Sequence, residues 1–363
     1  MKLIDRRDFM KAAGLAFAAT LAPRRLHAIE RADAVFATAY QDRSGFYGVA
    51  VLSDDRKLLF TTALPDRGHD VTFDPISRRS VVFARRPGTF AIVFDHAGKT
   101  EPVTIASVPG RHFFGHGVFS PDGALLYATE NDYENAAGVI GVYDATDSFR
   151  RIAEFPTHGM DPHEVLLLAD GRTLAIANGG VETHPDYGRA ELNIATMKPS
   201  LVFADRVSGD LMEEHVLAPS LHQLSLHHLA EDGSGAVWFG GQHKGPAADR
   251  PPLIGKARVG AEIELLAMED KVLGSLRNYI GSVAANHDAG TVAVSSPQGN
   301  SLVVIEARTG KVVSSRSLVE VCGLAPERQG YVASTGKGEI VDCNGDDTRF
   351  DDYVWDNHML RIG

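Results

Sequence analysis

The feature that most constrains the fold is a short motif that recurs along the chain. Four stretches contain a histidine, one variable residue, an apolar run and an Asp-containing turn. They read RGHDVTFDP, FFGHGVFSPDG, DPHEVLLLADG and SLHHLAEDG, and they contain His69, His116, His163 and His227. Self-similarity of this kind indicates one structural unit used several times, so it decides the architecture before any local motif is considered.

The same register extends to seven positions along the chain. The equivalent residues are His69, His116, His163, His227, Gly281, Cys322 and His358, separated by 47, 47, 64, 54, 41 and 36 residues. An aliphatic residue stands two places after each of them. In SLHHLAEDG the register does not decide between His227 and His228. Periods of roughly 40–50 residues with four strands per unit are typical of a β-propeller.

The remaining sequence also indicates β structure. From residue 31 onward, short apolar runs are separated by Gly, Asp, Asn and Pro at intervals of about ten residues, which is typical of an all-β domain. Strands near 33–40, 47–52 and 57–64 lack an inner partner, and the C-terminal WDNHMLRI can supply it. Pairing the two chain ends in one blade removes an open sheet edge.

These patterns predict an all-β, seven-bladed β-propeller over residues 29–363. Its ring is closed by N-terminal strands b, c and d together with C-terminal strand a. The other six inner strands are expected to begin at residues 69, 116, 163, 227, 281 and 322. A helix is expected only in part of 212–229. Inner strands line the channel of a propeller, so residues at one repeat position are expected to form a ring around its axis.

The first 28 residues are predicted to be an export signal rather than part of the fold. Arg6 and Arg7 precede an apolar segment that ends at the small residue Ala28, and Phe9 and Lys11 fit the extended twin-arginine motif. The alternative is a basic N-terminal helix. The signal predicts a periplasmic protein that is exported already folded, which is compatible with a metal loaded in the cytoplasm.

Composition narrows the classes of function. The net charge of −11 disfavours binding to nucleic acid or to an anionic membrane. No apolar run after residue 30 approaches the roughly 20 residues of a membrane helix, so no span is expected in the mature chain. GKGEI and GGQHKG lack the strand–loop–helix context of a phosphate loop, so no nucleotide cofactor is predicted. We expect a monomer.

The histidine ring predicts a transition-metal site. Imidazole and thiolate are common ligands of copper and iron. The predicted metal ligands are His69, His116, His163, His227, His228, His358 and Cys322. Because opposite walls of the channel are too far apart for one ion, we expect three or four histidines to bind it, or a polynuclear cluster to fill the gap. The structural alternative is that the histidines plug the channel and hydrogen-bond to backbone or water.

Loops at the same mouth offer further polar groups. Glu130, Glu182, His184 and His243 are the predicted cofactor- or substrate-contacting residues. The segment 183–201 is long for a loop between strands b and c. It is expected either to cover the mouth or to pack on a neighbouring blade.

The two cysteines leave other readings open. Cys322 beside histidine is also an alternative nucleophile for thiol catalysis, although no catalytic residue is assigned. A disulfide between Cys322 and Cys343 is not expected. The two would lie on strands a and c of one blade, about two strand spacings of 4.7–4.9 Å apart, which exceeds normal disulfide reach.

The chain resembles a known bacterial family. FSPDGALLYATEND is similar to repeats of YVTN-type propellers. The twin-arginine leader, GHGVFSPDGALLYATENDYE, DPHEVLLLADGRTLAIANGG, LSLHHLAEDGSGAVWFGGQ and WDNHM resemble the domain-of-unknown-function 1513 family. The resemblance implies a genomic neighbourhood with imelysin-like, iron-linked periplasmic proteins, and hence a periplasmic protein partner in a metal-uptake system. The histidine hub also resembles, as architecture only, the copper centre of nitrous oxide reductase.

Three functions are therefore compared below. The first is a periplasmic propeller that binds copper or iron through axial histidines, within an iron- or metal-uptake system. The second is a protein-interaction scaffold with a structural histidine ring and no metal. The third is a metal-dependent hydrolase or lactonase, whose channel ion is typically held by Glu, Asp and Asn rather than by histidines.

Overall fold

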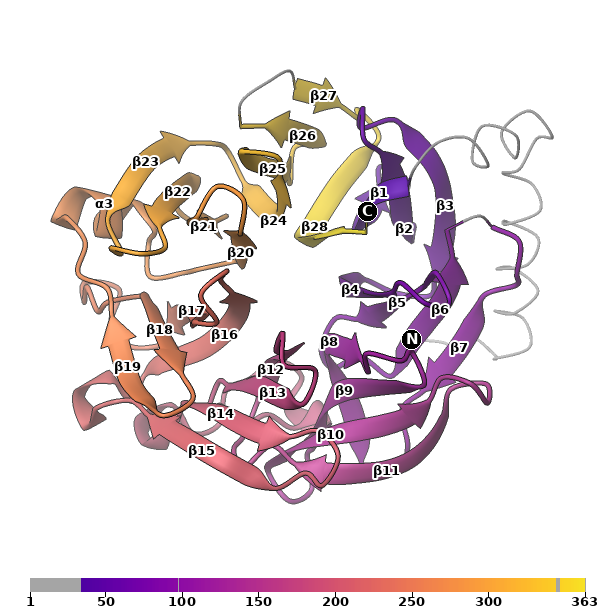
Figure 1. Ribbon diagram of the computed structural model, residues 1–363, viewed down its shortest axis with the longest axis horizontal. Coiled ribbons are helices and arrows are strands. Elements are labelled where there is room, and N and C mark those ends of the chain that lie inside the picture. The colour runs from indigo at the N-terminus through magenta and orange to yellow at the C-terminus, as the bar shows by residue number, and fades with distance from the viewer. Residues whose placement is uncertain (1–33, 97, 344–346, 363) are drawn as a thin grey trace.

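Seven four-stranded antiparallel sheets surround one central axis (Figure 1). The computed structural model describes residues 34–96, 98–343 and 347–362. It confirms the predicted all-β, seven-bladed propeller. The predicted export signal over residues 1–28 lies outside the described residues. Among the described helices, none is long and apolar enough to cross a membrane.

The closing blade joins both ends of the chain. Its strands are β28 (Tyr353–Arg361), β1 (Ala34–Asp42), β2 (Tyr47–Ser53) and β3 (Leu58–Leu64), in that order from the axis outward. β1 and β28 pair antiparallel, with Phe36 opposite Arg361. The predicted closure by three N-terminal strands and one C-terminal strand is therefore confirmed.

The next three blades follow along the chain. The second blade contains β4 (Gly68–Asp74), β5 (Arg79–Ala84), β6 (Phe90–Asp95) and β7 (Val103–Ala106). The third contains β8 (Arg111–Phe119), β9 (Leu125–Asp132), β10 (Ala137–Asp144) and β11 (Arg150–Pro156). The fourth contains β12 (Pro162–Leu167), β13 (Thr173–Asn178), β14 (Ser200–Asp205) and β15 (Leu211–Val216).

Three further blades complete the ring. The fifth contains β16 (Leu224–Glu231), β17 (Val237–His243), β18 (Ile254–Arg258) and β19 (Ala261–Leu265). The sixth contains β20 (Ser282–Asn286), β21 (Thr291–Ser296), β22 (Ser301–Glu306) and β23 (Val312–Ser317). The seventh contains β24 (Val321–Glu327), β25 (Gly330–Thr335), β26 (Glu339–Asp342) and β27 (Asp347–Arg349).

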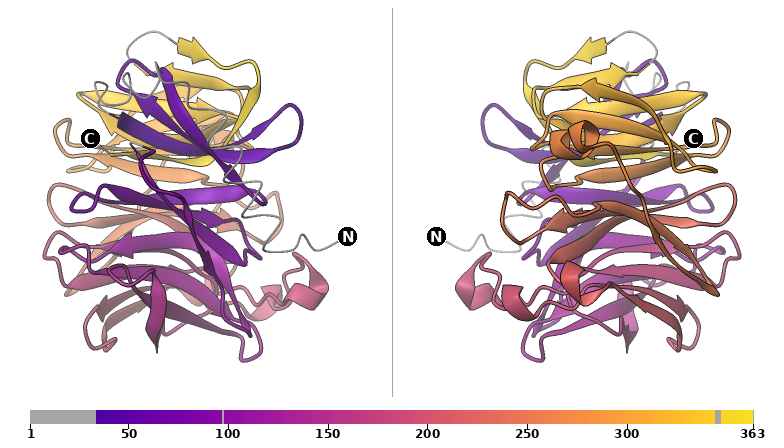
Figure 2. Two further views of the ribbon diagram at one scale, coloured as in Figure 1. Left: turned by 90° about the vertical axis from the view of Figure 1, so that its right-hand side faces the viewer. Right: turned by 90° about the vertical axis from the view of Figure 1, so that its left-hand side faces the viewer.

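Few helical turns interrupt the strands. Within the described residues they are the 3₁₀ turns η1 (Pro185–Tyr187), η2 (Ile194–Thr196) and η3 (Pro219–Leu221), and the short helix α3 (Asp270–Ser275). η1 and η2 belong to the loop between β13 and β14, which stands out from one face of the disc (Figure 2).

The helix expected in part of 212–229 is wrong. This segment forms β15, η3 and most of β16. β15 is an outermost strand, and its sequence LMEEHV is largely exposed. An exposed outer strand does not need strict alternation of apolar and polar residues. Its irregular pattern can therefore be taken for that of a helix. Two inner strands also begin earlier than expected, β8 at Arg111 and β16 at Leu224.

The Asp-containing turns close the hairpins between strands a and b. In SPDG, the Gly123 N–H donates to the Ser120 carbonyl at 2.9 Å, and the Ser120 hydroxyl donates to Asp122 at 2.5 Å. Gly123 has a φ of +67°, and a Cβ there would lie 2.6 Å from the Asp74 carboxylate of the preceding blade. The turn therefore needs glycine both for its backbone conformation and for contact between blades.

The hydrophobic core lies between blades rather than on the axis. Strands b and c, such as β13 and β14, are buried at every position. One core cluster joins Ala175 of β13, Trp238 of β17 and Val292 of β21, so it spans three successive blades. Because the apolar faces pack sideways, the axis is left for the polar ends of the inner strands.

Ring closure is expected to depend on the aromatic packing of β28. Trp355 is 2% exposed and packs against Tyr40, Phe350 and Tyr353, whereas its neighbour Val354 is 45% exposed. Trp355→Ala should lower the free energy of unfolding by about 3–5 kcal/mol, because it leaves a cavity in the closing blade. Val354→Ala, on the opposite face of the strand, should cost less than about 0.5 kcal/mol. Urea denaturation measures both, and equal losses would contradict this account of closure.

Candidate metal centre

Six histidine side chains converge within the central channel. They come from five blades: His69 of β4, His116 of β8, His163 of β12, His227 and His228 of β16, and His358 of β28. None is more than 9% exposed. Centroid distances between neighbouring rings run from 4.0 Å for His163 and His227 to 6.0 Å for His116 and His228. The structure thus brings both candidates of SLHHLAEDG into one group, hereafter the histidine cluster.

The histidines stand at irregularities in the inner strands. The pairing of β4 with β5 shifts between Gly68 and Val71, and the pairing of β12 with β13 shifts between Pro162 and Glu164. Similar shifts flank the histidines of β8, β16 and β28. β20 pairs with β21 without a shift and contributes no histidine, whereas the pairing of β24 with β25 shifts around Cys322. A β-bulge redirects a side chain, so these bulges account for histidines that point toward the axis.

Buried threonine hydroxyl groups donate hydrogen bonds to main-chain carbonyls at two of the bulges. The Thr129 hydroxyl on β9 donates to the His116 carbonyl at 3.1 Å, and the Thr38 hydroxyl on β1 donates to the His358 carbonyl at 2.7 Å. Both threonines are fully buried. A bulge frees main-chain groups from the ladder, and a threonine on the neighbouring strand satisfies the carbonyl at these two positions.

Many ring nitrogens of the cluster have no hydrogen-bond partner among the described residues. His163 lacks a hydrogen bond at both Nδ1 and Nε2. The same is true of His69 Nδ1, His116 Nε2, His227 Nδ1 and His358 Nε2. A buried polar atom without a partner costs about 1–3 kcal/mol. The backbone part of the structural alternative therefore does not describe these atoms, which have no protein partner among the described residues.

The nitrogens form three overlapping groups that could hold a metal ion. They are His69, His116 and His163; His116, His228 and His358; and His163, His227 and His228. Within each group the ligand atoms lie within 4.8 Å of one another. Two nitrogens bound to one ion at about 2.0–2.1 Å lie at most about 4.2 Å apart, so small side-chain shifts suffice. Subsets of three, rather than one complete ring, fit the geometry.

Two carboxyl groups orient the cluster from behind. The Nδ1 atom of His116 lies 3.1 Å from Asp70, and the Nδ1 atom of His228 lies 3.3 Å from Glu164. Each carboxyl group follows a cluster histidine by one residue and reaches the histidine of the next blade. This leaves Nε2 of His116 without a partner. A carboxylate behind a histidine that offers its other nitrogen is the usual outer shell of a metal site.

Burial keeps most of the cluster neutral. Burial is the main cause that holds the pKa of His69, His163, His227, His228 and His358 well below 6.5. For His116 burial acts in the same direction, but the Asp70 carboxylate outweighs it and the pKa is raised. Burial raises the pKa of Glu164 to about 8. Neutral imidazole is the form that binds metal.

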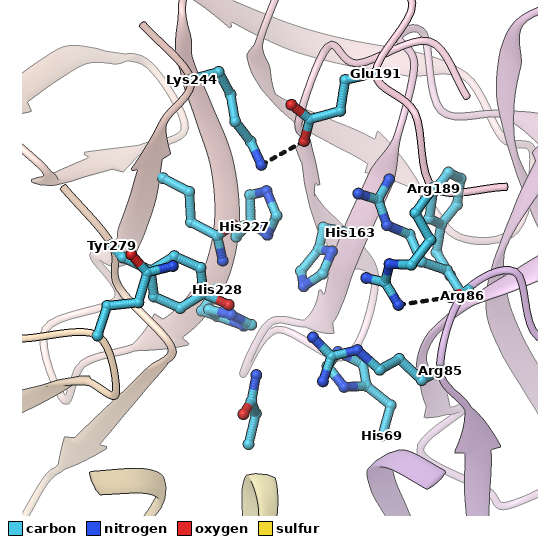
Figure 3. A pocket seen from close by; sticks show the side chains of 14 residues that line it. His69, Arg85, Arg86, His163, Arg189, Glu191, His227, His228, Lys244 and Tyr279 are labelled. Carbon is cyan, nitrogen blue, oxygen red and sulfur yellow. Dashed lines mark hydrogen bonds and ion pairs between the residues drawn. The ribbon is translucent and has the colours of Figure 1, made fainter. Parts of the chain in front are cut away.

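A cavity of about 290 Å³ opens above the cluster. Its lining includes His69, His163, His227 and His228, and Figure 3 shows these rings around the same space as Arg85, Arg86 and Arg189. The walls come from loops between strands b and c and from segments next to inner strands. The long 183–201 loop supplies Arg189 and Glu191, so it covers part of the mouth.

The structure places the other predicted site residues apart from this cavity. Glu130 is fully buried in its blade, where Arg151 and the Tyr143 hydroxyl contact it at 2.8 and 2.6 Å. Neither Glu182 nor His184 lines the cavity, and His184 instead caps η1. The His243 ring faces Asp249, 3.3 Å away.

Cys322 occupies its ring position but joins none of the three histidine groups of the described chain. Its thiol donates to the Glu320 carbonyl at 3.0 Å, and burial raises its pKa to about 12. A catalytic cysteine needs a lowered pKa, so this environment does not favour a nucleophile. Cys322 and Cys343 are both free thiols.

A sequence profile described as "Protein of unknown function (DUF1513)" matches residues 62–362. The chain belongs to this family. The match covers six complete blades and the C-terminal strand that closes this DUF1513 propeller. No curated protein matches the chain.

Solved structures share the fold of this DUF1513 propeller. Kuenenia stuttgartiensis hydrazine synthase is 16% identical, with a TM-score of 0.60 over 82% of this chain and 91% of that one. The Myceliophteria thermophila Cps50 (Swd1) β-propeller domain is 13% identical, with a TM-score of 0.57 over 84% of this chain and 93% of that one. At these identities the likeness concerns the propeller architecture alone.

Sequence reasoning missed several residues of the site. Asp70 and Glu164 were detectable, because each follows a repeat histidine and must face the neighbouring blade on an inner strand. Arg85 and Arg86 follow β5, at the mouth where strands b end. Tyr279 had no comparable signal, because it precedes β20, where the repeat position is Gly281 rather than a histidine.

The metal-free protein is expected to lose stability as the pH falls below about 6.5. The unfolded chain binds protons at its histidines in this range, whereas the five cluster histidines with lowered pKa values do not. Each contributes a limiting slope of about 1.4 kcal/mol per pH unit. The raised pKa values of His116 and Glu164 act in the opposite direction but are outnumbered. Urea denaturation at pH 7.5 and 5.5 measures this, and equal stabilities would contradict the neutral cluster.

Glu130 is expected to stabilise its blade. Glu130→Ala leaves the half-buried Arg151 and the buried Tyr143 hydroxyl without their carboxylate partner and should lower the free energy of unfolding by about 3 kcal/mol. Glu154 contacts the same Arg151 but its side chain is 39% exposed, so Glu154→Ala should cost less than about 1 kcal/mol. Chemical denaturation compares the two variants. A harmless Glu130→Ala combined with altered ligand binding would instead support a binding role.

Proposed function

We propose that this DUF1513 propeller binds a transition metal, copper or iron, through the histidine cluster in the periplasm. The observation that carries the proposal is the set of buried ring nitrogens without partners in His69, His116, His163, His227 and His358. One ion would satisfy several of these nitrogens together. No described protein group hydrogen-bonds to either nitrogen of His163, so both are available to an ion.

The donor set favours copper, with iron as the alternative. All three candidate groups contain imidazole alone. Imidazole suits copper, and copper heads the affinity order of the divalent first-row metals. Non-haem iron sites commonly add a carboxylate ligand, and here Asp70 and Glu164 contact histidine nitrogens instead. A bound copper or iron ion would supply redox chemistry or serve as cargo.

The protein's own residues would hold and orient the ion. His116, His163 and His228 each belong to two of the three groups, so they would carry most of the binding. Asp70 would fix the ring of His116, and Glu164 that of His228. The walls above the cluster would limit access of water to the ion.

Location and partner extend the proposal. The twin-arginine motif of residues 1–28 supports export of the folded chain to the periplasm. The family resemblance supports a periplasmic protein partner in a metal-uptake system. The channel would then store the ion or pass it on.

Metal content tests the proposal directly. The double variant His116→Asn/His163→Asn removes at least one member from each of the three groups. Protein exported natively should carry about one copper or iron ion per chain by elemental analysis, and the double variant should lose it. The control His96→Asn/His215→Asn replaces two buried histidines outside the cluster and should retain the ion.

The competing functions give other results. Wild-type protein that is metal-free after export, and that binds no added Cu²⁺ or Fe²⁺, would contradict the proposal and favour the scaffold. Stoichiometric calcium together with ester hydrolysis would favour the hydrolase or lactonase. Loss of metal in the control variant as well would indicate a general folding effect, which circular dichroism of both variants detects.

A further inference from the structure

The mouth above the histidine cluster is unusually rich in positive charge for an acidic chain. Arg85, Arg86, Arg189 and Lys244 line the cavity, against one lining carboxylate, Glu191. Figure 3 shows the three guanidinium groups near one another, beside His163 and His69. The net charge of the whole chain is −11, so this concentration of cations is local.

The nearby carboxylates do not neutralise these cations. Lys244 pairs with Glu191 at 2.7 Å, and Arg86 lies 3.3 Å from Asp161. Arg85 lies 3.7 Å from Asp356.

The Asp356 carboxylate is shared between two arginines. It pairs closely with Arg67 as well as with Arg85. Arg189 hydrogen-bonds only to the main-chain carbonyl of Arg86, at 3.2 Å, and has no carboxylate partner in the described part of the chain. Five cations thus meet three carboxylates.

The arginines also repel one another. Burial is the main cause that lowers the pKa of both Arg85 and Arg189, and neighbouring guanidinium groups lower it further. Charged groups held together against their repulsion bind an anion favourably, because the anion removes the repulsion and accepts their hydrogen bonds.

We propose that this cavity is a binding site for a small oxyanion, a carboxylate or a phosphate, held by Arg85, Arg86 and Arg189 above the histidine cluster. The planar fork of each guanidinium matches the oxygen atoms of either group. Gln242 and Tyr279 also line the walls and offer neutral polar groups. A volume of about 290 Å³ admits a small molecule and excludes a macromolecule.

This inference goes beyond the proposed metal function and stands without it. The arginines bind the anion whether or not the cluster holds an ion. Where the proposed function also holds, the oxyanion lies next to the metal and acts as its counter-ion or as an anionic chelator that accompanies it.

Calorimetric titration of metal-free protein tests the site. Citrate and inorganic phosphate are titrated separately at low ionic strength, so the two probes distinguish a carboxylate from a phosphate ligand. We expect one of them to bind with a stoichiometry of one. Arg189→Gln should weaken it about tenfold or more, because a charge-assisted hydrogen bond is lost. Arg308→Gln removes the same charge from an 82% exposed side chain and should leave binding unchanged.

The outcomes separate this site from the metal site. Arg85→Gln provides a second test inside the cavity. If Arg85→Gln fails to fold, the result for Arg189→Gln alone decides. Anion binding that persists in His116→Asn/His163→Asn supports the arginine site even if no metal is ever found. Binding of neither probe to wild-type protein, or binding unaffected by Arg189→Gln, would overturn the proposal.

Discussion

The antiparallel pairing of β1 with β28 is the interaction on which the rest of the structure depends. It closes the ring of seven blades, and it also carries His358 into the channel. The Thr38 hydroxyl, donated across this pair to the His358 carbonyl, joins the closure to the cluster. The seven inner strands hold a common axis only when the ring is closed. Closing the ring therefore also assembles the histidine cluster from residues that are far apart in the sequence.

Concentrating imidazoles at that axis is costly, and the fold shows how the cost is met. The apolar cores between blades supply stability away from the axis. Bulges turn the histidines inward, and the buried hydroxyls of Thr38 and Thr129 satisfy two of the main-chain carbonyls at these bulges. Of the 15 buried side-chain polar atoms without a hydrogen-bond partner in the described chain, six are ring nitrogens of the histidine cluster. Six such atoms facing one another at one place indicate a binding site rather than poor packing.

The sequence predicted the parts of this arrangement that repeat. Blade number, closure and the positions of His69, His116, His163 and His358 follow from one register, because equivalent positions of a propeller share a height on the axis. The register could not locate site residues that lie outside the repeat. Arg85 and Arg189 lie in loops of different length, so no spacing brings them together before the ring is built. Glu130 looked like a mouth residue because it ends an apolar strand, yet Arg151 from the same blade holds it inside.

The two proposals constrain each other through charge. Two like unit charges about 4 Å apart repel by about 4 kcal/mol at an effective dielectric constant of about 20, and a divalent ion meets about twice that. A bare metal dication would therefore be opposed by Arg85, Arg86 and Arg189 as it approached the cluster through the cavity. An oxyanion at the mouth removes this barrier, and so does insertion of the metal before the ring closes. The second route agrees with the proposed twin-arginine export, in which the chain would fold and load its metal before it crosses the membrane. The arginines above the cluster would then retain the anion and hinder exchange of the ion below it.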